Sequence, residues 1–224
     1  MKRFDLITIF PNSLDSYFTT SILKRAQGAK LIKIQAHNLR KYTLDKHRKV
    51  DDRVYGGGAG MVLQVEPVYR ALKALKVLPG KTVARKKVRV VLLSANGKQF
   101  SQADAKRLAK YERLVFICGR YEGVDARVEK FIDEKLSVGQ YVVTGGELPA
   151  AIIIDAVSRL VPGVVGKEES VQNESFSDGA NLEHPHYTRP EVFVVGKKKY
   201  RVPKVLLGGN HMDITTWRQL KSKP

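Results

Sequence analysis

The chain repeats one pattern three times: an apolar run, a polar loop that contains glycine, and a helical pattern. The apolar runs are Val88–Leu93, Leu114–Cys118 and Val138–Val143. The first two are continuous, as is typical of strands buried on both faces, and the third is interpreted as an alternating strand. Strands that alternate with helices favour a mostly parallel sheet, in which ligands bind beyond the carboxyl ends of the strands. The sequence therefore predicts an α/β fold with one ligand site built from three loops.

Two more strands and a helix are predicted near the N-terminus. The strands are Phe4–Phe10 and Leu31–His37, and between them Leu14, Phe18 and Ile22 follow helical spacing. This region adds a strand–helix–strand unit to the predicted sheet.

Helix start signals follow several of the loops. Ser101 and Asp104 have the spacing of a helix cap. Pro67 and Pro149 are each expected at the first position of a helix, because proline lacks an N–H and its fixed φ suits that position. Another helix is predicted from its apolar spacing over residues 124–132.

The third loop is a sharp turn, Thr144–Gly146, followed by Glu147 as an acid in the first turn of a helix. Two successive glycines let a ligand approach the main chain without meeting a Cβ, and the N–H groups at a helix start suit a polar or anionic group. The alternative is a plain turn between a strand and a helix with no ligand.

Four glycines lie between Gly56 and Gly60 in the segment YGGGAGM. A compact domain tolerates such a run where the backbone takes unusual dihedral angles or passes very close to another group. The segment is not a dinucleotide-binding fingerprint, because it lacks the third glycine of G-x-G-x-x-G and no strand precedes it.

The chain is strongly basic. Its 224 residues include 40 Lys and Arg against 22 Asp and Glu, a net charge of +18. A polyanionic partner, nucleic acid first, explains this excess most simply, and a generally basic protein is the alternative. Basic residues gather in Asn38–Arg53 and in Lys197–Arg201. Such clusters suit phosphates, although a solvated charged loop is the simpler interpretation of the first.

A single cysteine, Cys118, excludes an internal disulfide and a cysteine-rich zinc site. No apolar run approaches the ~20 residues that a membrane span requires, and the first residues do not follow the pattern of a signal peptide. We therefore expect a cytoplasmic protein with no membrane partner.

Several segments in order along the chain carry a resemblance to a known family. They are YGGGAGM, LLSANGK, FICGRYEGVDARV, SVGQYVVTGGELPAAIIIDAVSRLVPGVVG, ESFSDG and HPHYTRPEV. Together they closely resemble the bacterial tRNA (guanine-N1) methyltransferases of the TrmD type, over nearly the whole chain. The resemblance implies a fold of the SPOUT class, a parallel sheet whose last part is threaded as a deep trefoil knot, with a small C-terminal helical domain. General rules of folding would not have predicted a knot.

The resemblance also implies a division of the chain into three parts. Residues 1–166 would form the methyltransferase domain, 167–189 a flexible linker that carries the catalytic base, and 190–224 a short tRNA-binding domain. The last part is shorter than the resemblance leads us to expect.

The cofactor that the resemblance implies is S-adenosylmethionine, bound in a bent conformation by the three loops. Matched position by position, the family's cofactor contacts fall on Leu93, Ser94, Gly119, Tyr121, Glu122, Ser137, Val138, Gly139, Tyr141, Val143, Gly145, Gly146 and Pro149.

Two catalytic residues are implied in the same way. Arg159 would stabilise negative charge on guanine O6, although its spacing from Asp155 also suits a surface ion pair. Glu174 stands immediately before Ser-Phe, where the family has the aspartate proposed as general base. Because of this departure, Asp178 and Glu183 are alternative candidates for the base.

The reaction implied is methylation of N1 of guanosine 37, 3′ of the anticodon in tRNA. The family acts on the anticodon arm as a homodimer with shared active sites, and magnesium is implied to assist. His184 and His186 lack further matched ligands, so we expect no structural metal. The alternatives are another SPOUT RNA methyltransferase and a basic RNA-binding protein without catalysis.

Overall fold

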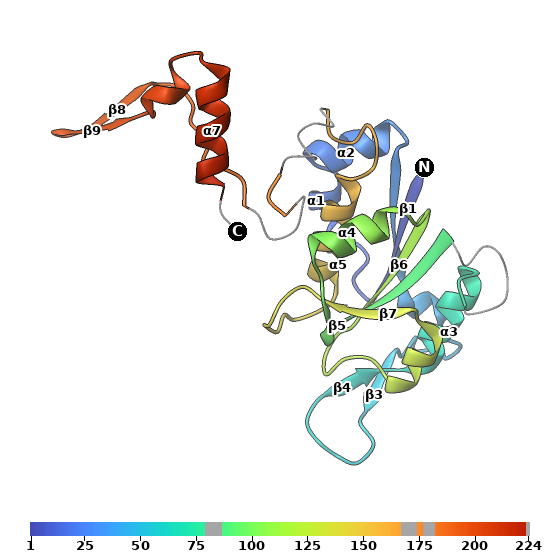
Figure 1. Cartoon of the computed structure of the whole chain (residues 1–224). Helices are drawn as coiled ribbons and strands as arrows, with labels where there is room; N and C mark the ends of the chain where they lie inside the picture. The colour runs from blue at the N-terminus through green and yellow to red at the C-terminus, as the bar shows by residue number, and fades with distance from the viewer. Residues whose placement is uncertain (79–86, 167–173, 177–181, 223–224) are drawn as a thin grey trace. The chain divides into compact units, whose positions relative to one another are not determined.

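The computed structural model of the chain describes residues 1–78, 87–166, 174–176 and 182–222 (Figure 1). The chain divides into two compact units, Met1–Glu168 and Glu169–Pro224. Within the described residues, no helix is both long and apolar enough to cross a membrane.

The larger unit is built on a parallel sheet of five strands in the order β2-β1-β6-β5-β7. In chain order the strands are β1 (Lys2–Thr8), β2 (Ile32–Asn38), β5 (Val88–Gln99), β6 (Arg113–Cys118) and β7 (Glu134–Ser137). The predicted parallel α/β sheet is therefore confirmed.

Both faces of this sheet are covered, and its inner strands β1 and β6 are accordingly buried over nearly their whole length. Phe4 and Leu6 of β1 pack in one core layer, and Ile7 packs in the other, as the alternation of side chains along a strand requires. The first layer includes residues of α2, α4 and α5, and the second includes residues of α3. The bounds of these helices are α2 (Ser21–Gly28), α3 (Val65–Ala74), α4 (Gln102–Ala109) and α5 (Glu147–Ser158).

Strand β5 is longer than predicted and pairs twice with the same residue of β7. Leu93 and, after a break in register, Lys98 both pair with Leu136. A Cβ added to Gly97 would lie 2.7 Å from both the backbone N and the backbone C of Leu136, so only glycine fits there. The predicted strand Val88–Leu93 was therefore too short, because β5 continues beside β7 as far as Gln99.

Strand β7 is displaced from its predicted position. It ends at Ser137, and residues 138–146 form a loop, so the prediction of a strand over Val138–Val143 was wrong. The apolar side chains of Tyr141, Val142 and Val143 are exposed rather than packed in a core layer. Their sequence pattern resembles that of a strand, but these residues do not pair with any described strand of the sheet.

Some helix predictions also needed correction. The N-terminal helix is divided into α1 (Asp15–Phe18) and α2, because Thr20 is extended with φ −116° and ψ 149°. Residues 126–131 form the 3₁₀ helix η3 (Ala126–Phe131). Pro67 and Pro149 each lie at the third helical position, where the N–H still has no intrahelical partner.

The cap of α4 is confirmed in full. The Ser101 hydroxyl accepts from the N–H of Asp104, and the Asp104 carboxylate accepts from the N–H of Ser101, which makes a reciprocal capping box.

The smaller unit is less helical than expected. Its described elements are the antiparallel hairpin β8 (Val192–Val195) and β9 (Lys198–Arg201), the 3₁₀ helix η4 (Lys204–Leu206) and α7 (His211–Lys221). Gly196, with φ +57°, and Lys197 form the two-residue turn of the hairpin. The expected helical domain therefore contains a β-ribbon as well.

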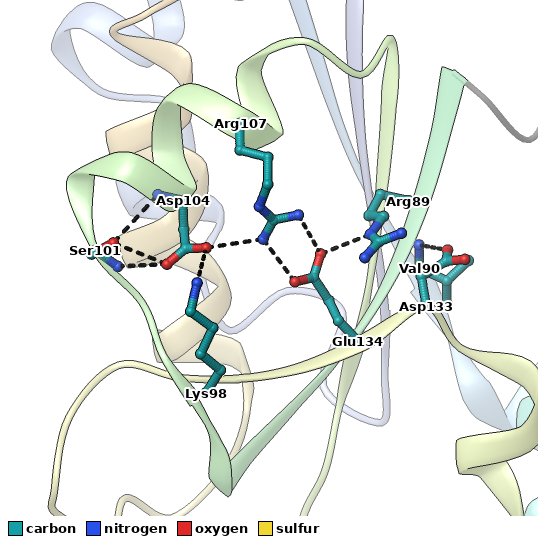
Figure 2. Close-up of polar contacts among 8 residues, drawn as sticks. All are labelled: Arg89, Val90, Lys98, Ser101, Asp104, Arg107, Asp133 and Glu134. Atoms are coloured by element: carbon teal, nitrogen blue, oxygen red, sulfur yellow. Dashed lines mark hydrogen bonds and ion pairs between the residues drawn. The ribbon is translucent and has the colours of Figure 1, made fainter.

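Figure 2 shows a network of charged side chains that joins α4 to β5 and β7. Arg107 donates to both carboxylate oxygens of Glu134, at 3.0 and 2.7 Å, and Arg89 donates to the same carboxylate at 2.8 Å. Asp104 accepts from Arg107 at 3.1 Å and from Lys98 at 2.7 Å. Arg89 precedes the first part of β5 that pairs with β7, and Lys98 begins the second part, so the network contacts β5 on both sides of the break in register.

The network lowers the pKa values of its two carboxyl groups. Burial alone would raise the pKa of Glu134, but hydrogen bonds from Arg107 and Arg89 outweigh this effect and lower the pKa. Burial would also raise the pKa of Asp104, but hydrogen bonds from Lys98 and Arg107 outweigh this effect and lower the pKa. A carboxyl group with a lowered pKa stabilises the fold above its unfolded pKa, and this stabilisation is lost as the pH falls through the folded pKa.

Glu134→Gln should lower the free energy of unfolding at neutral pH by roughly 1–3 kcal/mol, because Arg107 loses its charged partner. It should also remove part of the fall in stability between about pH 5 and pH 2. Urea unfolding at a series of pH values measures both effects. The control is Glu112→Gln, which removes an exposed ion pair with Lys87 and should change little. Equal effects of the two substitutions would contradict a stabilising role for the network.

Candidate functional site

The three predicted loops meet in one pocket at the carboxyl ends of β5, β6 and β7. The pocket has a volume of about 250 Å³. Its lining includes every residue that the resemblance assigns to the cofactor except Gly139. The remaining lining residues are Ala95, Arg120, Gly123, Leu136, Val142 and Thr144.

Gly139 does not line the pocket, although it lies next to a residue that does. A Cβ at Gly139 would lie 2.2 Å from Cε1 of Tyr141, which does line the pocket. The Ser137 hydroxyl donates to the Gly139 carbonyl at 2.9 Å, which fixes the loop directly after β7. A side chain at Gly139 would therefore displace a pocket residue.

The Gly-Gly turn is needed for contact between segments of the chain itself. Gly146 has φ −77°, which any residue adopts, but an added Cβ would lie 2.6 Å from the Cα of Cys118. The Gly146 N–H donates to the Gly119 carbonyl at 2.9 Å. The sequence interpretation gave room for a ligand as the reason for these glycines, whereas the structure gives close packing of the α5 start against the end of β6.

A buried carboxylate fastens this junction. Glu147, at the first position of α5, is 3% exposed and accepts hydrogen bonds from Thr8 at 2.5 Å and from the Arg120 Nε at 2.9 Å. The Arg120 guanidinium also donates to the Thr144 carbonyl at 3.3 Å and lies 4.7 Å from the ring centroid of Phe10. The ends of β1 and β6, the glycine turn and α5 are thus joined by one ion pair.

Arg120 was not among the predicted site residues, although it lines the pocket. The available signal was its position in the segment CGRYEG, between the two predicted residues Gly119 and Tyr121. The side chain of Arg120 also crosses directly over Gly145, where a Cβ would lie 2.2 Å from its Nε. Gly145 therefore makes room for the arginine.

Cys118 is buried beneath the junction. Burial raises the pKa of its thiol well above the usual value, and the nearby Glu147 carboxylate raises it further. The thiol is therefore neutral at physiological pH and is not an activated nucleophile.

The loop after β6 is bound on its other side to the glycine-rich segment. The hairpin β3 (Asp51–Arg53) and β4 (Met61–Leu63) brackets this segment. Its Met61 carbonyl accepts from the Glu122 N–H at 3.0 Å, and a Cβ at Gly60 would lie 2.5 Å from Cγ of Glu122. The glycines at 56, 57, 58 and 60 all have positive φ, which confirms the prediction of unusual dihedral angles.

Tyr121 is held in a conformation that a bulky residue rarely adopts. Its φ is +59°, and a hydrogen bond to Asp51 of β3 raises the pKa of its hydroxyl. The tyrosine therefore links the pocket to the end of the basic segment Asn38–Arg53.

The predicted catalytic residue Arg159 is not part of the pocket lining. Arg159 follows the last residue of α5 and lines a separate groove with Tyr17, Ile152 and Asp155. Asp155 accepts a hydrogen bond from the Tyr17 hydroxyl.

Glu174 and Glu183 belong to the smaller unit, and Asp178 lies outside the described residues, as do residues 167–173 of the predicted linker. The Glu183 N–H donates to the Ser175 hydroxyl at 3.0 Å, and the Glu183 carboxylate lies 3.0 Å from Nε2 of His186. In the described parts of the chain, no group of three or more His, Cys, Asp and Glu side chains is arranged to hold a metal ion.

Comparison with known proteins gives one family. The protein-family model described as tRNA (Guanine-1)-methyltransferase TrmD matches residues 1–224. A tRNA (guanine-N(1)-)-methyltransferase of Geotalea uraniireducens is 48% identical over 221 residues, which are 98% of this chain and 85% of the relative. Proteins with the same name from Dictyoglomus turgidum and Clostridium novyi are 48% and 47% identical, with 98% of this chain and 84% and 86% of each relative covered.

Arg120→Gln should be strongly destabilising, because it leaves the buried Glu147 carboxylate without a cation. Breaking a buried ion pair in this way costs about 3–5 kcal/mol of unfolding free energy. The double variant with Glu147→Gln should be less destabilised than the sum of the two single variants, since the two residues act as one unit. Urea unfolding measures all three.

The control is Arg127→Gln, which breaks the ion pair with Asp125 at a guanidinium that is 64% exposed. If Arg120→Gln costs no more stability than this control, the ion pair with Glu147 does not hold the junction.

Proposed function

The chain belongs to the tRNA (guanine-1)-methyltransferase TrmD family, and from this premise we propose that it transfers the methyl group of S-adenosylmethionine to N1 of guanosine 37 in tRNA. The observation that carries the proposal is the pocket at the strand ends, since almost every residue that the resemblance assigns to the cofactor lines it. A tRNA substrate leads us to expect that the protein works in the cytoplasm.

The chemistry of the pocket suits S-adenosylmethionine. Main-chain groups of the Thr144–Gly146 turn and the apolar side chains of Leu93, Val138 and Pro149 can surround an adenine ring. The carboxylate of Glu122 suits the cationic end of the cofactor. When bound, this cofactor supplies the methyl group, and the protein supplies its position.

The residues outside the pocket supply the acid–base chemistry in this proposal. N1 of neutral guanine carries a proton, so the reaction needs a base, and we assign this role to Glu174. As the proton leaves, negative charge grows on O6, where the guanidinium of Arg159 stabilises it. Holding N1 in line with the methyl group provides much of the remaining acceleration.

The choice of Glu174 rests on its place before Ser175-Phe176. Glu183 is the strongest alternative, since its backbone N–H binds the Ser175 hydroxyl and its carboxylate lies 3.0 Å from Nε2 of His186. Asp178 is the other alternative.

The proposal extends to the fold and to the smaller unit. We infer a trefoil knot in the last part of the sheet, and the irregular pairing of β5 supports it, because Leu93 and, after a break in register, Lys98 both pair with Leu136. We assign methyl transfer to residues 1–166, the base to the linker 167–189 and a grip on the anticodon arm to residues 190–224. The four cations in the β8–β9 hairpin support that last assignment.

We further propose that the enzyme is a homodimer with shared sites. The groove beside Arg159 is lined by Tyr17, Leu148 and Ile152, which are 47%, 54% and 41% exposed. An exposed apolar groove of this kind suits a second copy of the chain. Arg159 would then lie at the subunit interface.

The purified protein should methylate N1 of guanosine 37 in a tRNA transcript, as measured by mass spectrometry of the digested RNA, with magnesium present and then removed. Glu174→Gln should lower the single-turnover rate by about 10²- to 10⁴-fold while the affinities for tRNA and cofactor stay unchanged. Asp178→Asn and Glu183→Gln are the matched comparisons. Should one of these abolish activity while Glu174→Gln keeps it, the base is assigned to the wrong residue.

Mixing two inactive variants tests the shared site. One variant is Arg159→Ala and the other is Glu174→Gln. If the Arg159 and the Glu174 of one site come from different subunits, a heterodimer with one subunit of each variant has one intact site. Random mixing makes half of the dimers heterodimers, so about a quarter of the sites should recover activity. No recovery in a mixture that light scattering shows to be dimeric would mean that both residues of each site come from one subunit.

A further inference from the structure

The β8–β9 hairpin presents side chains of two kinds on both of its faces. Its register pairs Phe193 with Tyr200 and Val195 with Lys198, so these four side chains share one face. The opposite face carries the pairs Val192–Arg201 and Val194–Lys199. Apolar and cationic side chains are therefore mixed on each face.

The apolar side chains of the hairpin are not packed in a core. Phe193 is 58% exposed, Val194 52%, Val195 53% and Tyr200 55%. A ribbon of two strands is marginal in water unless its side chains pack against something else. The exposure therefore points to a binding surface.

The charge of the ribbon defines the class of partner. From Val192 to Arg201 the sequence contains Lys197, Lys198, Lys199 and Arg201 and no acidic residue. A cluster of cations without acids suits a polyanion.

The two aromatic rings narrow the choice among polyanions. Phe193 and Tyr200 lie directly across the ribbon from each other, with ring centroids 6.4 Å apart and planes at 36°. Exposed rings with cations beside them are the usual platform for unpaired bases of RNA. An anionic membrane would favour a ribbon with apolar residues on one face and cations on the other, which this ribbon does not have.

We propose that the β8–β9 hairpin binds unpaired RNA, with bases stacked on Phe193 and Tyr200 and phosphates held by Lys198 on the same face and by Lys197 in the turn. The inference rests on the proposed action on tRNA and deepens it: the smaller unit recognises a single-stranded loop through stacking as well as through charge.

The test compares two kinds of variant in the full chain, with an RNA hairpin of anticodon-arm sequence and a blunt RNA duplex of equal length as probes. Phe193→Ala/Tyr200→Ala should weaken binding of the RNA hairpin by at least about 5-fold without changing the slope of log K against log salt. It should leave duplex binding unchanged. Replacement of Lys197, Lys198 and Lys199 by Ala should instead flatten that slope by about 0.7 to 0.9 for each phosphate that the variant no longer binds.

Two controls isolate the aromatic rings. Val192→Ala/Val194→Ala changes the opposite face, and Tyr200→Phe keeps the ring, so both should bind the RNA hairpin like the unchanged protein. Unchanged RNA affinity in the aromatic double variant would overturn the proposal, as would an equal decrease for hairpin and duplex. If the aromatic double variant keeps its RNA affinity but binds anionic phospholipid vesicles more weakly than the unchanged protein does, the surface binds a membrane instead. Methylation of guanosine 37 by the unchanged protein is scored separately, so a failure of the proposed reaction is distinguished from a failure of this surface.

Discussion

The contact between the glycine turn and the end of β6 determines the shape of the pocket. Gly146 lies so close to Cys118 that no side chain fits between them, and its N–H is bound to the Gly119 carbonyl. This contact sets where α5 begins, and α5 in turn carries Pro149 into the pocket and Arg159 to the neighbouring groove. The pocket and the residue proposed to stabilise O6 therefore depend on one backbone contact.

Two ion-pair systems hold the chain on either side of this contact. Glu147 and Arg120 join the ends of β1 and β6 to the turn, and Glu134 joins β7 to β5 and α4. Each system is centred on a carboxylate that is largely buried, so each is costly to break by removing one partner. Together they hold β7, the glycine turn and the start of α5 in place, and such preorganisation reduces the entropy that ligand binding would otherwise cost.

Sequence reasoning located the sheet and the site because both depend on patterns that lie close together in the chain. Buried apolar runs identified β5 and β6, and the polar residues after them identified the pocket loops. Prediction from the sequence failed where contacts between distant segments determine the structure. The run Val138–Val143 has the composition of a strand, but Ser137 is the last residue that β5 pairs with, so the run becomes a loop. The reason for Gly146 is the position of Cys118, which no local pattern contains.

The double pairing at Leu136 also bears on how the protein is made. Lys98 and Gln99 are synthesised well before Leu136 and Ser137, yet they can complete their strand pairing only when β7 is present. The pocket further needs Gly145, Gly146 and Pro149, which follow β7 in the chain. During translation the earlier strands β1, β2, β5 and β6 can associate first, whereas the wall formed by residues 93–95 waits for the segment that ends at Pro149. A chain that ends before Leu136 therefore lacks β7 and the residues that complete the pocket.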